Sequence, residues 1–229
     1  WGTQLFWPLN YRVAFKSIFV IDPLYTLPLT FCLIWLALLS RESRKRRLLN
    51  KIGLVISTSY LLITIGIKLY VNTVFDAAFT HQQITIKRFE SRPAPLNTVL
   101  WAVNAESTDG FYVGYYSLLD TNQEIDFFYF PKNIHLIKSY EHHREVQLLM
   151  DISNQWFTLT THEEGIVFND LRFGQRTGWT SEDGDFVFSY LIKWDKKTLQ
   201  IKELEKEFSD GKSLMTALWN RILGKDLKK

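Results

Sequence analysis

The chain has 229 residues, of which 46% are hydrophobic and 15% aromatic. This share of core-forming side chains excludes a disordered polymer. The formal net charge of +3 gives no support to a nucleic-acid partner, and the single cysteine excludes an internal disulfide and any cysteine-cluster metal site.

The small net charge hides an uneven distribution of charged residues. Residues 41–51 carry six basic side chains and one acidic side chain, whereas residues 80–192 carry eight basic and fifteen acidic side chains. The chain starts at Trp1, and no signal-peptide pattern precedes its first apolar stretch. We therefore expect a protein that is truncated at its front.

The first 21 residues interleave aromatic side chains with polar and basic ones, as segments at the level of lipid headgroups do. A simple interfacial belt is one interpretation of this pattern. The other makes Thr3, Gln4, Asn10 and Arg12 the rim of a polar site that opens at the outer membrane surface, with Thr3, Gln4 and Arg12 as the substrate-binding candidates.

Two uncharged stretches predict helices that cross a bilayer. Residues 24–39 reach about 24 Å at about 1.5 Å per residue, slightly less than the roughly 30 Å of a hydrocarbon core. Residues 52–67 form the second stretch, and Lys68 can extend its ammonium to the headgroups while the helix continues. Buried globular helices are the alternative, but we expect transmembrane helices at about 22–40 and 52–71.

The basic loop at residues 41–51 predicts the orientation of this hairpin. By the positive-inside rule, so short and basic a connection lies in the cytoplasm. The interfacial segment 1–21 and everything after the second helix then lie on the extracytoplasmic side. Contact with nucleic acid or the nuclear-import machinery is the less favoured interpretation of the basic run.

Beyond the membrane region, which we place at residues 1–79, the pattern changes to that of an extracytoplasmic, β-rich domain at residues 80–229. Aromatic and β-branched runs separated by Gly, Asp and Asn predict a meandering antiparallel sheet. The expected strands cover 98–103, 111–119, 125–130, 156–161, 165–173 and 186–194. Helices are expected within 141–153 and around 214–222, so the fold class is α+β.

Asp22 is the most interesting single residue. A carboxylate at the mouth of a membrane helix is costly unless it is paired, solvated or bound to a cation. Followed by Pro23, it is also a good helix N-cap. Both a cap and a functional ligand remain open.

The remaining candidates give weaker signals. The five histidines do not follow any known metal-ligand spacing, and the motifs of nucleotide-binding and nucleophilic hydrolase sites are absent. Asp170 and Arg172 stand two residues apart, which places them on one face of a strand. There they either pair with each other or bind a polar ligand, and a surface ion pair or a turn network is the favoured interpretation.

Five blocks of sequence occur in a characteristic order: GTQLFWP, FVIDPLYTLP, RPAPLNTVLW, FYVGYYSLLD and VFNDLRFG. Together they resemble the YdjM-type family of membrane-bound, metal-dependent hydrolases, which LexA regulates in some bacteria. The similarity spans nearly the whole chain.

The resemblance implies a divalent metal, zinc, held mainly by histidines and aspartates upstream of Trp1. In that family, an H-R-G-x-T-H block and an H-x-x-x-D block precede the G-T-Q stretch, which here is Gly2 to Gln4. Asp22 matches the family's aspartate-proline and is the only ligand candidate in this chain. A distant similarity of the family to zinc-dependent phospholipase C and P1-type nucleases implies phosphoester substrates.

Two functions follow as hypotheses. The first is the C-terminal part of a bacterial inner-membrane metal-dependent hydrolase that acts on phosphoester or lipid-like substrates, with the lipid bilayer as its partner. The second is a non-enzymatic, membrane-anchored module that binds an envelope ligand. The sequence names no catalytic residue and indicates no oligomeric state.

Overall fold

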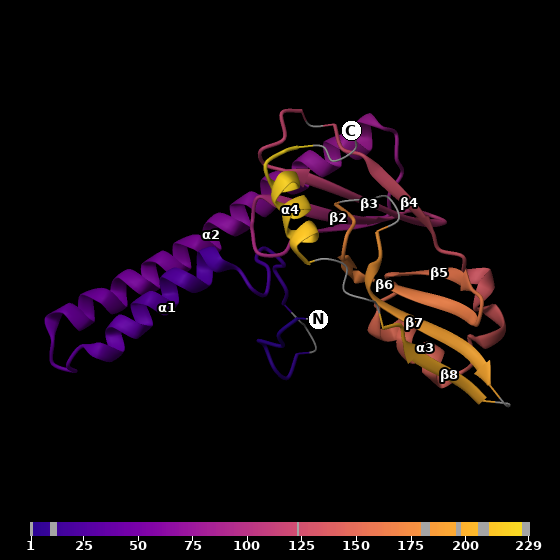
Figure 1. Cartoon of the computed structure of the whole chain (residues 1–229), viewed down its shortest axis with the longest axis horizontal. Helices are drawn as coiled ribbons and strands as arrows, with labels where there is room; N and C mark the ends of the chain where they lie inside the picture. The colour runs from indigo at the N-terminus through magenta and orange to yellow at the C-terminus, as the bar shows by residue number, and fades with distance from the viewer. Residues whose placement is uncertain are drawn as a thin grey trace. The chain divides into compact units, whose positions relative to one another are not determined.

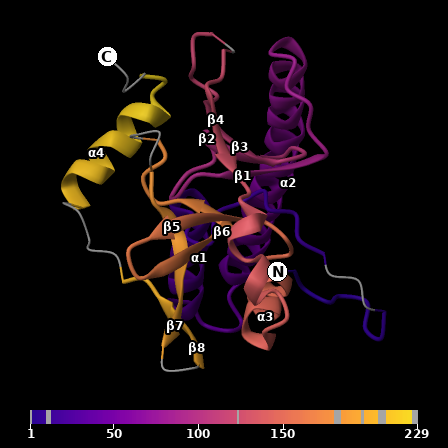
Figure 2. The ribbon, with the colours of Figure 1, turned by 90° about the vertical axis from the view of Figure 1, so that its right-hand side faces the viewer.

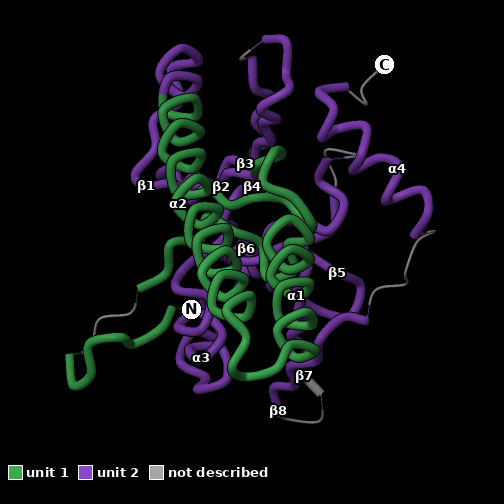
Figure 3. The backbone as a smooth tube through the Cα atoms, turned by 90° about the vertical axis from the view of Figure 1, so that its left-hand side faces the viewer, with its two compact units in different colours: residues 1–76, 91–101 green, residues 77–90, 102–229 purple. Residues whose placement is uncertain are grey.

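The computed structural model describes residues 2–9, 13–122, 124–179, 184–195, 198–205 and 211–225. The chain divides into two compact units, which Figure 3 shows in green and purple. Unit 1 comprises Trp1–Asp76 and Ser91–Trp101, and unit 2 comprises Ala77–Glu90 and Ala102–Lys229. Both units draw on separate stretches of chain, because helix α2 and strands β1 and β2 each cross a boundary between them.

Unit 1 is built on a pair of helices, α1 (Pro23–Leu38) and α2 (Arg44–His81, of which the part up to Asp76 belongs to this unit). The two helices lie side by side in Figures 1 and 3. A Cβ atom at Gly53 would lie 3.2 Å from the Cβ atom of Cys32, so this glycine permits a close approach. Near the start of α1, the ring of Tyr25 lies beside that of Tyr60, with centroids 6.2 Å apart.

The turn between the helices is short, because α2 already begins at Arg44 and most of the basic residues lie in its first turns. Arg46 closes the turn. Its Nη1 donates hydrogen bonds to the carbonyl oxygens of Leu36 and Leu39, both at 3.0 Å. A cation at this place satisfies free carbonyls of the last turn of α1 and interacts favourably with the negative end of the helix dipole.

Within the described chain, α2 is the one helix whose length and composition would let it cross a membrane, whereas α1 is apolar but shorter. Only 11% of the most apolar window of α2 is buried. Large apolar side chains on the outside of both helices are exposed, among them Leu27 (68%), Leu38 (80%) and Leu62 (64%).

Two four-stranded antiparallel sheets follow, each with its strands in chain order. The first contains β1 (Arg88–Pro93), β2 (Leu100–Glu106), β3 (Gly110–Ser117) and β4 (Phe127–Pro131). The second contains β5 (Phe157–His162), β6 (Gly165–Gln175), β7 (Phe186–Asp195) and β8 (Thr198–Glu203).

Helix α3 (Arg144–Ile152) packs on the second sheet, as Figures 1 and 2 show. The buried core between them contains Val146 of the helix and Phe157, Leu159 and Phe168 of the strands. The rings of Phe157 and Phe168 are stacked, with centroids 4.5 Å apart. Two short 3₁₀ turns, Ile134–Leu136 and Lys138–Tyr140, lead into α3, and helix α4 (Gly211–Ile222) ends the described chain.

The expected α+β class with antiparallel strands is therefore confirmed. The expectation of one meandering sheet was wrong in its detail. The turns and helix at residues 134–152 interrupt the ladder after β4, so β5 starts a second sheet. Strands β1 and β8 were not expected, because their sequences, RFESRP and TLQIKE, are mostly charged or polar.

Candidate functional site

Asp22 is the centre of the candidate site in unit 1, and only 1% of it is exposed. Its Oδ1 accepts hydrogen bonds from the backbone N–H groups of Leu24 (2.9 Å) and Tyr25 (3.4 Å). The backbone of Asp22 is extended, and Pro23 stands at the first helical position. The expected N-cap of α1 is thus confirmed, and the negative charge lies at the positive end of the helix dipole.

The second carboxylate oxygen of Asp22 reaches helix α2. The Tyr60 hydroxyl donates a hydrogen bond to Oδ2 at 2.8 Å and lies 3.3 Å from the Thr98 hydroxyl. Three donors therefore hold the buried carboxylate, and no Lys or Arg of the described chain forms an ion pair with it. Such donors lower the cost of burying a carboxylate in apolar surroundings.

Tyr60 belongs to a polar stripe on α2, which also contains Thr64, Lys68 and Asn72. A spacing of four residues keeps these side chains on one helix face. The Thr64 hydroxyl is completely buried, donates to the carbonyl of Leu61 at 2.8 Å and lies 3.3 Å from the Ser17 hydroxyl. The stripe is therefore covered in part by the segment that leads into α1.

Lys68 and Asn72, which form the C-terminal half of the stripe, contact the segment that starts at Ser91. Lys68 Nζ donates to the carbonyl oxygens of Ser91 (2.9 Å) and Lys16 (3.3 Å). The Ser91 hydroxyl in turn donates to Asn72 Oδ1. The Lys68 ammonium, which the sequence allows to extend toward the headgroups, is bonded to two backbone carbonyls of unit 1.

The residues present do not by themselves form a metal centre. Among the residues that can be described, no three His, Cys, Asp or Glu side chains lie together closely enough to hold an ion. A zinc site needs three or four protein ligands. The zinc that the resemblance implies would thus need ligands beyond Asp22, and the role of Asp22 as a ligand stays a prediction.

Among the residues that the structure describes, Thr3 and Gln4 contact neighbours in the chain and not Asp22. Thr3 pairs with Val13 through two backbone hydrogen bonds of 2.9 and 3.0 Å. The Gln4 side-chain amide donates to the carbonyl of Leu9 at 2.9 Å. Both residues are exposed and belong to a local loop. Asn10 and Arg12 lie outside the described residues, so the common role of these residues in substrate binding remains a prediction.

Asp170 and Arg172 form an ion pair in β6, but this pair does not lie at the surface as the favoured interpretation had it. Arg172 Nη2 lies 2.6 Å from Asp170 Oδ2, and Arg172 Nε lies 3.1 Å from both carboxylate oxygens. The side chains are 14% and 4% exposed, so this pair is largely buried. The Asp170 carboxylate also accepts a hydrogen bond from the backbone N–H of Arg172, so both of its oxygens are bonded to the same residue.

A second charged cluster in unit 2 was not foreseen. Glu106 of β2 accepts hydrogen bonds from Arg88 Nε (2.6 Å) and Lys132 Nζ (3.0 Å). Burial raises the pKa of Glu106, but the hydrogen bonds and charges of Lys132 and Arg88 outweigh burial, so its pKa is lower than usual. The Arg88 guanidinium also lies over the ring of Trp156, 4.6 Å from its centroid.

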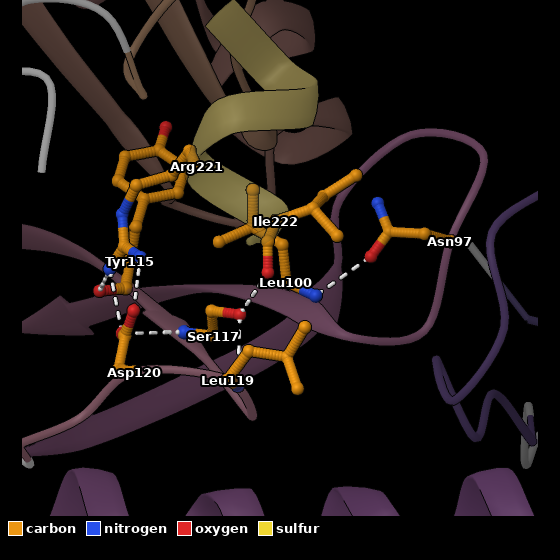
Figure 4. Close-up of polar contacts among 8 residues, drawn as sticks. All are labelled: Asn97, Leu100, Tyr115, Ser117, Leu119, Asp120, Arg221 and Ile222. Carbon is orange, nitrogen blue, oxygen red and sulfur yellow. Dashed lines mark hydrogen bonds and ion pairs between the residues drawn. The ribbon is translucent and has the colours of Figure 1, made fainter. Parts of the chain in front are cut away.

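A third cluster holds the end of α4 to strand β3 and the turn that follows it (Figure 4). Arg221 binds Asp120 through two contacts of 2.5 and 2.8 Å and donates to the carbonyl of Tyr115. The Ser117 hydroxyl donates to the carbonyl of Ile222 at 2.6 Å. The same view shows Asn97 Oδ1 accepting the backbone N–H of Leu100, which closes a loop of unit 1.

Comparison with known proteins adds no relative. No protein-family model matches the chain, and neither a curated protein nor a solved structure matches it.

Proposed function

We propose that α1 and α2 form a membrane hairpin that anchors this chain in the bacterial inner membrane, with unit 2 on the extracytoplasmic side. The observation that carries the proposal is the exposure of large apolar side chains along both helices. An apolar surface of this extent is unfavourable in water and favourable in lipid. A core helix of a soluble protein would instead be mostly buried. In α2, only 11% of the most apolar window is buried.

The length of the helices is compatible with this role. Helix α1 extends over about 24 Å and α2 over about 57 Å at about 1.5 Å per residue. A hydrocarbon core is roughly 30 Å thick, so α2 is long enough to cross it and to continue beyond, whereas α1 needs the preceding residues 18–22 to complete its span. The partly buried polar stripe of α2 has intramolecular partners, as polar groups at membrane depth require.

Cysteine labelling tests the orientation. In a Cys32→Ala background, Ser40→Cys places a thiol in the exposed turn after α1, and Thr108→Cys places one in the exposed turn between β2 and β3. An impermeant reagent added to spheroplasts is expected to label position 108 and to label position 40 only after permeabilisation. The opposite pattern would overturn the orientation, and a fragment that is freely water-soluble without detergent would overturn the membrane anchor.

The chain is, in this proposal, the C-terminal part of a metal-dependent hydrolase that acts on phosphoester or lipid-like substrates at the outer membrane surface. The ordered sequence blocks that resemble the YdjM-type family support this function. The position of Asp22 supports it as well, because the residue that matches the family's aspartate-proline is a buried carboxylate at a junction of two helices. The other metal ligands are expected upstream of Trp1.

An Asp22→Asn variant of the full-length protein separates capping from metal binding. Asparagine caps helices as well as aspartate does but is a weaker ligand for a cation. We expect the bound zinc, measured by mass spectrometry of the purified protein, and the hydrolysis of bis-p-nitrophenyl phosphate to fall together while the melting temperature changes little. Unchanged zinc content and hydrolysis would leave Asp22 as a helix cap.

A membrane-anchored binding module without catalysis is the second candidate. One observation favours this candidate: both oxygens of the Asp22 carboxylate already accept hydrogen bonds, three in all, from groups of unit 1. Full-length protein that contains no stoichiometric metal and does not hydrolyse phosphoesters would support this candidate against the hydrolase.

A further inference from the structure

Helix α4 carries an exposed apolar stripe beside its buried face. Leu218 and Ile222 are 4% and 7% exposed and pack into unit 2. Met215, Trp219 and Leu223 repeat every four residues, and between 42% and 62% of each is exposed. Residues with this spacing lie on one side of a helix.

Contacts at its C-terminal end fix the orientation of α4 and therefore keep the stripe exposed. The pair of Arg221 with Asp120 and the hydrogen bond from Ser117 to the carbonyl of Ile222 prevent the helix from rotating (Figure 4). A Cβ atom at Gly224 would lie 2.4 Å from the carbonyl oxygen of Leu119, so the chain after α4 packs directly on this turn.

The Leu119 side chain, in the turn against which Gly224 packs, is also 52% exposed. We call the four side chains of Leu119, Met215, Trp219 and Leu223 the α4 patch.

Basic residues flank the α4 patch. Lys212 at the start of α4 and Lys225 after its end are both exposed. The last six residues of the sequence contain three lysines and one aspartate. An apolar stripe with tryptophan and flanking lysines is typical of helices that lie in the interface of a bilayer with anionic lipids.

We propose that the α4 patch inserts into the headgroup region of the bilayer and that anionic lipid headgroups bind the adjacent lysines. This inference rests on the proposed membrane anchor, because α2 continues from the apolar stretch into unit 2 and tethers that unit near the bilayer surface. The charge of the flanking lysines is complementary to phosphate-bearing lipids. Insertion would make α4 a second, reversible contact of the protein with the membrane.

A fluorescent probe at single cysteines tests the inference in the full chain. The Cys32→Ala protein is labelled with an environment-sensitive dye at Trp219→Cys in the α4 patch or at Ser213→Cys, which is exposed on the polar side of the same helix. The protein is reconstituted into vesicles of phosphatidylethanolamine and phosphatidylglycerol with and without a brominated lipid. Iodide serves as the quencher in water.

The expected result is that brominated lipid quenches the dye at position 219 at least about threefold more than at position 213, with the reverse order for iodide. Replacing phosphatidylglycerol by phosphatidylcholine should reduce the difference, and so should Lys212→Glu together with Lys225→Glu. Equal lipid quenching at the two positions would overturn the proposal. Protection of position 219 from both quenchers would also overturn it, since a protein segment then covers the patch.

A third label at Ile63→Cys, on the exposed apolar side of α2, distinguishes this failure from failure of the membrane anchor. Quenching by brominated lipid at position 63 but not at position 219 would refute only the role of α4. Absence of lipid quenching at position 63 would refute the anchor itself.

Discussion

Asp22 is both the N-cap of a helix and a buried carboxylate, and each role sets a structural requirement. It begins a helix, which needs a hydrogen-bond acceptor near the first N–H groups. It is also buried, which needs enough donors to replace water around the carboxylate. The structure meets both needs with separate oxygens, because Oδ1 caps α1 and Oδ2 accepts the Tyr60 hydroxyl. Any additional role in binding a cation has to be compatible with this arrangement.

Tyr60→Phe is predicted to destabilise unit 1 by about 1–2 kcal/mol, because it removes one donor from a buried carboxylate. Tyr25→Phe is the control, since the ring of Tyr25 lies beside that of Tyr60 but no hydrogen bond of its hydroxyl is seen in the described structure. Unfolding in mixed detergent micelles measures both variants. Equal losses for the two would mean that the hydroxyl of Tyr60 contributes nothing specific.

Glu106 provides a prediction on pH. Its pKa in the folded protein is lower than its ordinary value of 4.5, because the hydrogen bonds from Lys132 and Arg88 outweigh the effect of burial. Such a group stabilises the folded state at pH values above its ordinary pKa, and this contribution is lost as the pH falls through the folded pKa.

We therefore expect Glu106→Gln to lower the free energy of unfolding by about 1–2 kcal/mol at pH 7, a modest value because Arg88 is partly exposed to solvent. The difference from the parent protein should shrink as the pH falls below 4.5 and through the folded pKa, where the Glu106 carboxyl becomes protonated. Glu164→Gln is the matched control, because Glu164 also pairs with a lysine, Lys193, but is exposed. A pH-independent difference at position 106 would contradict the assigned cause.

Among the elements, α4 is held in part by an ion pair between residues far apart in the sequence. The Arg221–Asp120 pair is 11% exposed on each side and joins residues that are 101 positions apart. Breaking a buried pair leaves an uncompensated charge, which is more costly than losing an exposed pair. The short amphipathic helix is otherwise held by two buried side chains, Leu218 and Ile222, and by hydrogen bonds from Ser117 to Ile222 and from Arg221 to Tyr115.

A double-mutant cycle of Arg221→Met and Asp120→Asn is predicted to give a coupling energy of about 2 kcal/mol in chemical unfolding. The cycle of Arg176→Met and Asp185→Asn serves as a comparison, because Asp185 is 58% exposed and the two groups are 3.5 Å apart. That pair is expected to couple by less than about 1 kcal/mol. A coupling of similar size in both cycles would show that burial does not decide the strength of the α4 contact.

At the scale of the whole molecule, the proposed orientation depends on the cations at the start of α2. Arg46 is already engaged with the end of α1, so it has a structural role in addition to its charge. The other basic residues of the turn, namely Arg41, Arg44, Lys45, Arg47 and Lys51, have no such contact in the described structure. They are therefore the ones whose charge can be changed with the least effect on the hairpin itself.

Replacing Arg41, Arg44, Lys45 and Arg47 together by glutamine is predicted to produce a mixed or inverted orientation, because the positive-inside bias of the loop is mostly lost. Labelling of Ser40→Cys and Thr108→Cys from outside measures the two orientations. Glu42→Gln is the control, since it changes one charge in the same turn without reducing the bias. A fixed orientation in the fourfold variant would show that other features set the topology.

The sequence by itself determined the features that depend on neighbours in the chain. The strands β2 to β7, the helix α3 and the cap at Asp22 follow from periodicity, turn residues and the placement of Asp22 before Pro23, all within a few residues. The strand β1 escaped prediction because pairing with β2, rather than β propensity, makes RFESRP a strand.

The tertiary structure decided which distant side chains meet. Asp22 and Tyr60 are 38 residues apart, and nothing in either local pattern indicates that α2 presents its hydroxyl to the cap of α1. The same holds for Arg88, Glu106 and Lys132, which form one cluster from three strands or their ends. Periodicity tells which face of an element is polar, but the partner of that face depends on how elements pack. The free energy of such contacts comes from burial and geometry that exist only in the folded chain.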